Sequence, residues 1–185
     1  MPVIICLLRG VNIGGHHKIK MDVLRGICES LDFKDVQTLL QSGNVAFRAR
    51  ERNLPRISTQ IQDGIERKAG FRPDVIVRTL PELRDVIARN PFAKRRGIES
   101  NKFGVGFLGG LPTNEARESL LKLKIAPEEV HLDGRELYVY FTNGMARPSF
   151  SPSVIERALK TSSTMRNWNT VTKLLELAEK LGQNP

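Results

Sequence analysis

The hydrophobic positions in the first half of the chain form continuous runs and runs at helical spacing. Residues 3–8 (VIICLL) are continuously apolar, which is typical of a buried central strand. Residues 54–69 carry apolar side chains on one helical face, and Gly70 ends that helix. In order, the pattern predicts a strand at 3–8, a helix from 21 to 31, strands at 36–41 and 45–48, a helix at 54–69 and a strand at 75–77. This order is β-α-β-β-α-β.

A second series of elements repeats that order after a linking helix. Thr79-Leu80-Pro81-Glu82 is a capping box, and Asn90-Pro91 ends the helix that it begins. Asp133-Gly134 predicts a type I′ hairpin turn, and Ser151-Pro152 predicts a helix start. In order, the pattern predicts a strand at 103–108, a helix from 113 to 123, strands at 129–132 and 136–141, a helix from 152 and a last helix from 170 to 181.

The order β-α-β-β-α(-β), met twice, is the pattern of ferredoxin-like domains. We therefore predict an α+β fold of two ferredoxin-like (βαββαβ) subdomains packed together, plus a C-terminal helix. The first subdomain and the linking helix take residues 1–90, a linker loop takes 91–101, and the second subdomain with the C-terminal helix takes 102–185. The pattern leaves open whether the two sheets join.

Composition and net charge indicate which class of protein this is and which kind of partner it could bind. With 185 residues, of which 40% are hydrophobic and 26% charged, the chain has the composition of a soluble globular protein. The apolar run at residues 2–8 is too short to span a membrane and no basic segment precedes it, so we expect a cytoplasmic protein with no membrane partner. The formal net charge of +9 lies mostly in residues 1–100. It favours an anionic partner such as nucleic acid or a nucleotide, although a solvated basic surface explains it equally well.

Several catalytic and cofactor motifs are missing from the sequence. The glycine-rich segment after the first strand matches neither the P-loop nor the dinucleotide-binding fingerprint. His16, His17 and His131 lack the spacing of metal ligands, while Cys6 and Cys28 are predicted to lie in the core. We therefore name no metal and no cofactor, and whether the protein is an enzyme stays open.

Three polar segments remain as candidates for a ligand site. The first is the opening loop, residues 9–20, because glycines bring backbone N–H groups close to fixed cations. The second is the turn at 41–44, and the third is segment 164–173, where a predicted helix N-terminus lies beside cations. The candidate ligand-binding residues, including one from the loop after Gly144, are Arg9, Asn12, Gly14, Gly15, Lys18, Lys20, Ser42, Asn44, Arg147, Arg166, Asn167, Asn169 and Lys173.

Each segment also has a structural explanation. Gly14-Gly15 suits a tight connection, and Gly43-Asn44 provides the two positive-φ positions of a hairpin turn. Asn167 or Asn169 is a natural N-cap for the last helix.

The aromatic residues raise a further hypothesis, that the protein binds nucleic acid by stacking bases on their rings. Trp168 is better explained by core packing than by ligand contact. Tyr138 and Tyr140 share one face of a predicted strand, which keeps base stacking as a lesser hypothesis.

The residues of these segments resemble the signature blocks of a bacterial family, the domain of unknown function family 1697. The blocks are 7–15 (LLRGVNIGG), 20–21 (KM), 41–45 (QSGNV) and 166–171 (RNWNTV). The resemblance covers essentially the whole chain and implies two ferredoxin-like subdomains but no activity. The family commonly has Lys-Asn where this chain has His16-His17, and a lysine usual after Gly144 is replaced in the run 146–149 (ARPS).

Three hypotheses on function remain. The first is a binding protein for an anionic, phosphate-bearing ligand, with nucleic acid as the first partner to test. The second is a transferase or hydrolase for a nucleotide-like substrate, in which Arg9 and Arg166 would stabilise negative charge. The signature blocks offer no obvious general base for that chemistry. The third is a scaffold whose polar blocks hold the subdomains together. The sequence does not indicate the oligomeric state.

Overall fold

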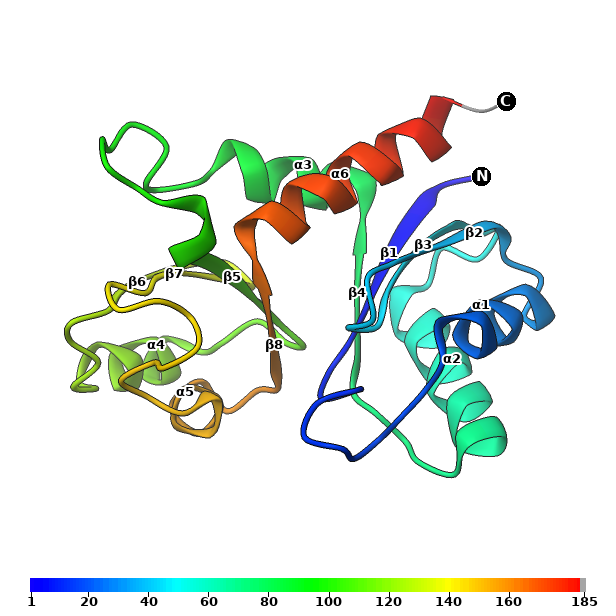
Figure 1. Ribbon diagram of the computed structural model, residues 1–185, viewed down its shortest axis with the longest axis horizontal. Coiled ribbons are helices and arrows are strands. Elements are labelled where there is room, and N and C mark those ends of the chain that lie inside the picture. The colour runs from blue at the N-terminus through cyan, green and yellow to red at the C-terminus, as the bar shows by residue number, and fades with distance from the viewer. Residues whose placement is uncertain (184–185) are drawn as a thin grey trace. The chain divides into compact units, whose positions relative to one another are not determined.

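The computed structural model describes residues 1–183, and Figure 1 shows its helices and strands. The elements are β1 (Val3–Leu8), α1 (Met21–Ser30), β2 (Lys34–Leu39), β3 (Asn44–Arg48), α2 (Leu54–Ala69), β4 (Val75–Thr79), α3 (Leu80–Ala88), β5 (Phe103–Leu108), α4 (Asn114–Leu121), β6 (Glu129–Asp133), β7 (Glu136–Tyr140), α5 (Pro152–Leu159), β8 (Ser163–Asn167) and α6 (Trp168–Gln183), with a 3-10 turn at Ser100–Lys102. The strands form two separate antiparallel sheets with the orders β2-β3-β1-β4 and β6-β7-β5-β8. Both subdomains are therefore ferredoxin-like, as the hydrophobic pattern predicts.

The chain divides into two compact units. Unit 1 contains residues 1–85 and the residues from Lys173 on, and unit 2 contains residues 86–172. The sequence-based division assigned all of the last helix to the second half, whereas the part of α6 after Thr172 belongs to unit 1. There, Arg84 Nε donates a hydrogen bond to Glu179 Oε1 at 3.1 Å. The two residues are 95 positions apart in the sequence, so local patterns do not reveal this contact.

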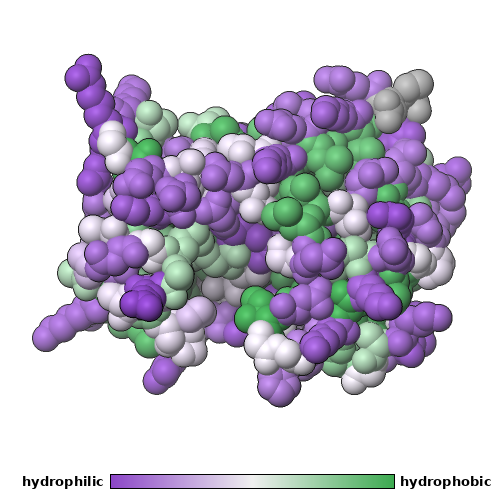
Figure 2. Space-filling model, in the orientation of Figure 1, coloured by the Kyte–Doolittle hydropathy of each residue, from purple (hydrophilic) through white to green (hydrophobic). Residues whose placement is uncertain are grey.

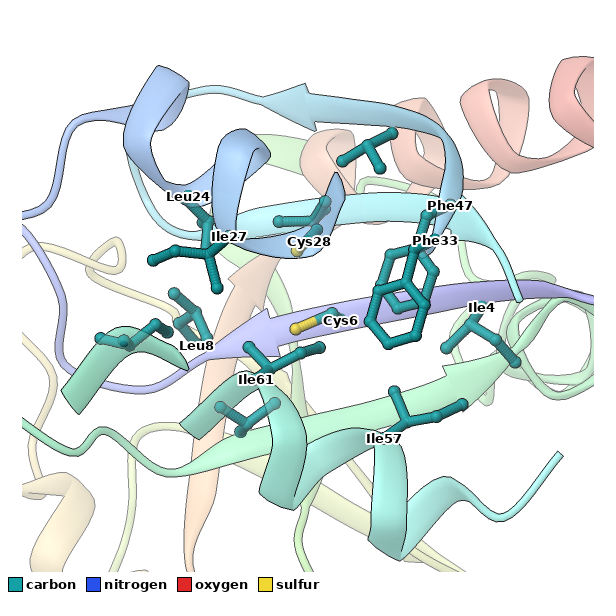
Figure 3. Close-up of a cluster of buried hydrophobic side chains, with 14 of the residues drawn as sticks. Ile4, Cys6, Leu8, Leu24, Ile27, Cys28, Phe33, Phe47, Ile57 and Ile61 are labelled. Atoms are coloured by element: carbon teal, nitrogen blue, oxygen red, sulfur yellow. The ribbon is translucent and has the colours of Figure 1, made fainter. Parts of the chain in front are cut away.

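The core of unit 1 lies between one face of its sheet and helices α1 and α2 (Figure 3). Alternate residues of β1, namely Ile4, Cys6 and Leu8, point into this core. Phe33 and Phe47 stack in it with their ring centroids 4.3 Å apart. Helix α2 has the predicted length because its N-terminus is capped by Asn53 and its C-cap, Gly70, has φ 75°.

The linking helix α3 begins with the predicted capping box. The backbone N–H of Thr79 donates to Glu82 Oε2 at 2.7 Å, and the backbone N–H of Glu82 donates to Thr79 Oγ1 at 3.3 Å. The two residues thus satisfy each other's backbone donors at the helix start.

The core of unit 2 is built in the same way, with α4 and α5 against one face of the sheet β6-β7-β5-β8 (Figure 1). The central strand β5 carries Gly104 and Gly106 opposite the core residues Val139 and Leu137 of β7. A Cβ atom on Gly104 would lie only 2.9 Å from Met145 Cε. Glycine therefore lets a large methionine pack directly on the central strand.

Two local predictions in unit 2 are corrected by the structure. The hairpin between β6 and β7 pairs Asp133 with Glu136, so its two central residues are Gly134 and Arg135. Of these, only Gly134 has a positive φ, 58°, which is a type II′ pattern and not type I′. The first residues of segment 164–173, for which the sequence predicted a helix start, instead belong to strand β8 (Ser163–Asn167), which pairs with β5. Helix α6 accordingly starts at Trp168, two residues before the predicted start.

Hydrophilic residues cover most of the face shown in Figure 2, with separate hydrophobic areas between them. Within residues 1–183, no helix is both long enough and apolar enough to cross a bilayer.

Candidate functional site

The opening loop, residues 9–20, folds into a miniature hairpin between β1 and α1. Ile13 and His16 form an isolated antiparallel bridge, and the N–H of His16 donates to the carbonyl of Ile13 at 3.4 Å. The two residues between them, Gly14 and Gly15, have φ values of 62° and 82°, the signs that a type I′ turn requires. A Cβ atom on either glycine would meet nothing within 4 Å. The glycines are thus needed for backbone conformation, and the space around them is open.

Asn12 fastens this loop through its side chain. Its Nδ2 donates to the carbonyl of Ile19 at 2.9 Å and to the carbonyl of Gln41 at 2.7 Å. Its Oδ1 accepts the backbone N–H of Ile19 at 2.9 Å. The amide thus uses both N–H bonds and its oxygen within the protein, which holds the loop closed and ties it to the turn after β2. Asn12 therefore shapes the loop, which is the structural explanation of this residue.

The turn between β2 and β3, which we call the β2–β3 turn (residues 40–43), packs directly under the opening loop. Its positive-φ positions are Leu40 at 59° and Gly43 at 71°, whereas the sequence predicted Gly43 and Asn44. A Cβ on Gly43 would lie 2.6 Å from Val11 Cγ2, so only glycine fits there. Asn44 belongs instead to β3 and is fully buried.

The side chain of Asn44 forms hydrogen bonds with residues in and next to this turn. Asn44 Nδ2 donates to the carbonyl of Leu39 and to Ser42 Oγ, each at 2.9 Å. The carbonyl of Gly43 accepts the backbone N–H of Leu8 at 2.8 Å. The turn is thus tied to the end of β1, and Asn44 lies beneath the surface.

A pocket of about 420 Å³ lies where the loop and the turn meet. Its lining residues are Asn12, Gly15, Lys18, Ile19, Lys20 and Gln41. Lys18 and Lys20 are exposed, and neither forms an ion pair with any residue in the described range 1–183. We call this the loop pocket.

Helix α1 begins directly after Lys20, a lining residue of the loop pocket. Lys20 is the N-cap residue of this ten-residue helix, and no side chain hydrogen bond caps the helix within the described residues. The first backbone N–H groups of a helix have no partner inside the helix, and the helix dipole adds partial positive charge there. Asp22 supplies one negative charge in the first turn, but it lies 3.6 Å from Arg25. The electrostatic character of the pocket is therefore positive.

Two further loop residues lie at the base of the hairpin and contact the segment before β4. Arg9 Nη1 lies 3.5 Å from Asp74 Oδ2, and the backbone N–H of Arg9 donates to the carbonyl of Asp74 at 2.9 Å. The ring of His17 stacks on Phe71 with a centroid distance of 4.8 Å. Both side chains of the Arg9–Asp74 pair are about half exposed, so solvent weakens their attraction.

A larger hollow of about 540 Å³ lies beside β2 but has a different charge character. Its lining includes Arg25, Glu29, Lys34 and Asp35. Lys34 pairs with Asp32 at 2.5 Å, and Arg25 lies close to Asp22. Because its cations already have carboxylate neighbours, this hollow is less suited to an anion than the loop pocket.

In unit 2, Arg166 lies on strand β8 and not at a helix N-terminus as the sequence suggested. Only 8% of the residue is exposed. Its Nη1 donates to Thr164 Oγ1 at 2.7 Å and to the carbonyl of Met165 at 2.9 Å. These bonds satisfy part of a guanidinium that is otherwise costly to bury.

Asn167 is the residue that caps α6. Its Oδ1 accepts the backbone N–H of Asn169 at 2.9 Å, and its Nδ2 donates to the carbonyl of Asn101 at 3.1 Å and to Met145 Sδ at 3.3 Å. Asn169 itself is exposed, as are Arg147 and Lys173. Of the two predicted caps, Asn167 is therefore the one that is used.

The aromatic residues of unit 2 pack against one another. Trp168 stacks on Phe103 with a centroid distance of 4.6 Å, and Phe92 meets Phe103 edge-on at 5.3 Å. The hydroxyl of Tyr138 donates to the carbonyl of Val86 at 2.9 Å, and Tyr140 is buried as well. The packing explanation of Trp168 is confirmed, and base stacking on Tyr138 and Tyr140 is excluded by their burial.

The candidate residues are thus distributed over both units. The opening loop and the β2–β3 turn, which carry the candidates from Arg9 to Ser42, lie together in unit 1, and Asn44 of β3 and Lys173 also belong to unit 1. Arg147, Arg166, Asn167 and Asn169 belong to unit 2. A single cleft containing all of them stays a prediction. Gln41 is not among the predicted ligand-binding residues, yet it lines the loop pocket. Its backbone carbonyl accepts the hydrogen bond from Asn12 Nδ2.

Comparison with known proteins supports the fold. The family model described as "Protein of unknown function (DUF1697)" matches residues 1–138, which is more than half of the chain. The chain belongs to this DUF1697 family. A solved structure, that of the conserved bacterial protein SP0830 from Streptococcus pneumoniae, is similar to this DUF1697 chain with a TM-score of 0.73 and 18% sequence identity. The match covers 96% of this chain and 98% of that one, and at this identity it shows the fold alone. The search of curated proteins found no match.

Proposed function

We propose that this DUF1697 protein binds an anionic, phosphate-bearing ligand in the loop pocket, with nucleic acid and nucleotides as the first partners to test. The observation that supports the proposal is the uncapped start of α1 beside Lys18 and Lys20, two lysines without an ion pair in the described chain. Phosphate oxygens accept hydrogen bonds from backbone N–H groups at a helix start and attract lysine ammonium groups.

The rigidity of the pocket adds to this support. Asn12 joins Ile19 to Gln41, so the two sides of the pocket are held together before any ligand arrives. A site that is already ordered loses less conformational entropy when it binds. We therefore assign Asn12, Ser42 and Asn44 to shaping the site, and Lys18 and Lys20 to contacting the ligand.

The lining of the loop pocket does not favour an enzyme. It includes two lysines, an asparagine and a glutamine but neither a carboxylate nor a histidine among the described residues. General acid–base catalysis at pH 7 usually relies on those missing groups. Binding is therefore the function that we propose.

We also propose a cytoplasmic location in a bacterium, which accords with a nucleotide or nucleic-acid partner. Neither Cys6 nor Cys28 is in a disulfide, and both are buried. Reduced cysteines are usual in the reducing cytoplasm.

The test is a salt titration of fluorescence anisotropy with a labelled single-stranded and a labelled duplex oligonucleotide. The double variant Lys18→Gln/Lys20→Gln should bind more weakly than the wild type. If both lysines contact phosphates, the slope of log K against log salt should fall in magnitude by about 1.4 for the single strand. The double variant Lys122→Gln/Lys124→Gln is the matched control, because it removes the same charge from exposed positions in unit 2.

Two results would overturn the proposal. One is the absence of binding to either oligonucleotide at low salt. The other is an equal loss of binding in the two double variants, since that would mean that net charge alone and not the loop pocket attracts the ligand.

A further inference from the structure

Strand β6 is the outermost strand of the sheet in unit 2, and no strand of residues 1–183 pairs with its outer side (Figure 1). It pairs with β7 at five consecutive positions, and the last pair, Asp133 with Glu136, closes a two-residue turn. Residues that close such a turn exchange hydrogen bonds, and hydrogen-bonded pairs then alternate with non-hydrogen-bonded ones along the strands. The backbone N–H and C=O groups of Val130 and Leu132 therefore point away from β7.

The equivalent edge of unit 1 is interrupted. Strand β2 is the outermost strand of that sheet, and its register with β3 shifts between Lys34 and Gln37. Asp35, which lies within the shift, has a φ of 53°, in the left-handed region. A bulge of this kind bends an edge strand and hinders its pairing with a further strand. Of these two edges, β6 is the one that keeps a continuous register and an extended backbone.

Helix α4 carries an exposed apolar side chain beside this edge. The side chains of Val130 and Leu132 pack against the core cluster that contains Leu120 of α4, so α4 covers the face to which they point. Arg117 Nη2 donates to the carbonyl of Gly134 at 3.3 Å, and this side of the helix therefore faces the turn between β6 and β7. Four residues further, on the same side of the helix, lies a leucine at position 121 that is 83% exposed.

We propose that the β6 edge binds a second copy of this chain, with the two β6 strands antiparallel and related by a two-fold axis at His131. The surface lies in unit 2 and is independent of the proposed function. In this register, Val130 of one copy lies opposite Leu132 of the other, on both sides of the axis. Each such pair exchanges hydrogen bonds through the backbone groups that point away from β7. The same patch on both copies thus satisfies itself, as a two-fold interface requires.

Both faces of the paired strands suit a second copy. On the face that α4 covers, the neighbours across the axis are valine and leucine, both apolar and half-buried. On the other face, Glu129 lies opposite Asp133 of the second copy, and like charges in that position repel each other. However, Arg95 Nη1 lies 2.5 Å from Glu129 Oε2, and Arg89 Nη1 lies 3.7 Å from Asp133 Oδ2. Each carboxylate therefore brings its own cation to the interface.

The size of this interface predicts a weak dimer. Each copy contributes a strand of five residues, and Leu121 extends the contact beside it. Stable interfaces bury about 1,200–2,000 Å² in total, and strand pairing of this length lies at or below the low end of that range. We therefore expect the balance of monomer and dimer to change with protein concentration.

Sedimentation velocity over a series of protein concentrations tests the proposal. The mass of the wild type should rise with concentration from the 20.8 kDa of one chain toward twice that value. His131→Glu places two like charges opposite each other at the axis and should raise the dissociation constant by about fivefold. Gln37→Glu is the matched control, because Gln37 is also exposed but lies on the interrupted edge of β2. It should leave the dissociation constant unchanged.

A cysteine at the axis tests the register. Non-hydrogen-bonded partners on antiparallel strands have Cα atoms about 4.5 Å apart, a distance that a disulfide spans. After mild oxidation, His131→Cys should therefore run as a disulfide-linked dimer on a non-reducing gel, whereas Gln37→Cys should stay monomeric. The native Cys6 and Cys28 are buried, so neither should form a link between chains.

A second pair of variants tests the contribution of α4. Leu121→Asn should raise the dissociation constant by about fivefold, because the leucines lose the apolar burial that the dimer provides. Leu40→Asn removes an exposed leucine from unit 1 and should have no effect. All the substituted side chains are exposed, so each variant is expected to fold, and thermal denaturation of each one checks this point.

Three results would overturn the proposal. The first is a monomeric mass throughout the concentration series, which would leave the β6 edge to an extended segment of a different protein. The second is equal cross-linking of His131→Cys and Gln37→Cys. The third is a dimer that His131→Glu weakens no more than Gln37→Glu does, since its interface would then lie elsewhere on the chain.

Discussion

Replacing Gly43 by alanine would place a methyl group where the β2–β3 turn meets the opening loop. Two costs add at this position. The first is conformational, because Gly43 has φ 71° and an L residue in the left-handed region costs roughly 1–2 kcal/mol. The second is steric, because the new Cβ would lie 2.6 Å from Val11 Cγ2 and 2.7 Å from Leu8 Cβ. Overpacking of this kind costs about 1–3 kcal/mol in well-packed sites.

Gly70→Ala separates the two costs. Gly70 has φ 75° at the end of α2, and a Cβ there would meet nothing within 4 Å. It therefore carries the conformational cost alone, about 1–2 kcal/mol. The free energy of unfolding of Gly43→Ala should be lower than that of Gly70→Ala by the steric term of about 1–3 kcal/mol. For a chain of this size, each kcal/mol corresponds to a Tm change of about 2–4 °C.

The assay is urea denaturation followed by circular dichroism, with Tm measured in parallel for the wild type and both variants. Under the proposed function, Gly43→Ala should also weaken oligonucleotide binding, because a shift of Val11 displaces the neighbouring Asn12, which ties the loop to Gln41. Equal destabilisation by Gly43→Ala and Gly70→Ala would refute the reasoning, since it would show that the opening loop yields to the added methyl group without cost.

Three more predictions follow from single side chains. Asn12→Ala removes three hydrogen bonds and should lower the free energy of unfolding by about 2–4 kcal/mol in urea denaturation, and a change below about 0.5 kcal/mol would show that Asn12 does not fasten the loop. Asn167→Ala removes the N-cap of α6 and should cost about 1 kcal/mol by the same measurement, whereas Asn169→Ala, which removes no capping side chain, should cost less. Burial, with a smaller contribution from Glu29, raises the pKa of the Cys28 thiol to about 12, so the unfolded chain loses this proton first as the pH rises above 9. Stability should then fall by up to about 1.4 kcal/mol per pH unit in that range, and Cys28→Ala should reduce this slope; an unchanged slope in the variant would assign it to other groups.

The elements of the fold were predictable because their signals are local. The capping box at Thr79, the left-handed stop at Gly70 and the alternation in β1 each depend on residues within one or two turns of chain. Strand β8 was less clear, because segment 163–167 is rich in polar residues and Arg166 resembles a surface residue. It is a strand because β5 offers a free edge, and pairing with that edge is a long-range interaction.

The segments of the candidate site could be picked out from the sequence, but the hydrogen bonds that their side chains form could not. Glycines and cations in the opening loop marked the segment, yet the sequence treated Asn12, Ser42 and Asn44 as ligand contacts. The structure shows instead that the side chains of Asn12 and Asn44 hold backbone carbonyls within unit 1. Polar residues that bind a ligand and polar residues that fasten a loop have the same chemistry, so only the positions of their partners distinguish them.

The sequence alone therefore determined the two ferredoxin-like subdomains, their order of elements and the segments where polar residues gather, because backbone preference and hydrophobic period act over short distances. The tertiary structure decided which of those polar groups face solvent. It buried Arg166 and Asn44, left Lys18 and Lys20 exposed beside the start of α1, and joined the opening loop to the β2–β3 turn through Asn12. Burial and contact between distant segments depend on how the whole chain packs, and no local pattern contains that information.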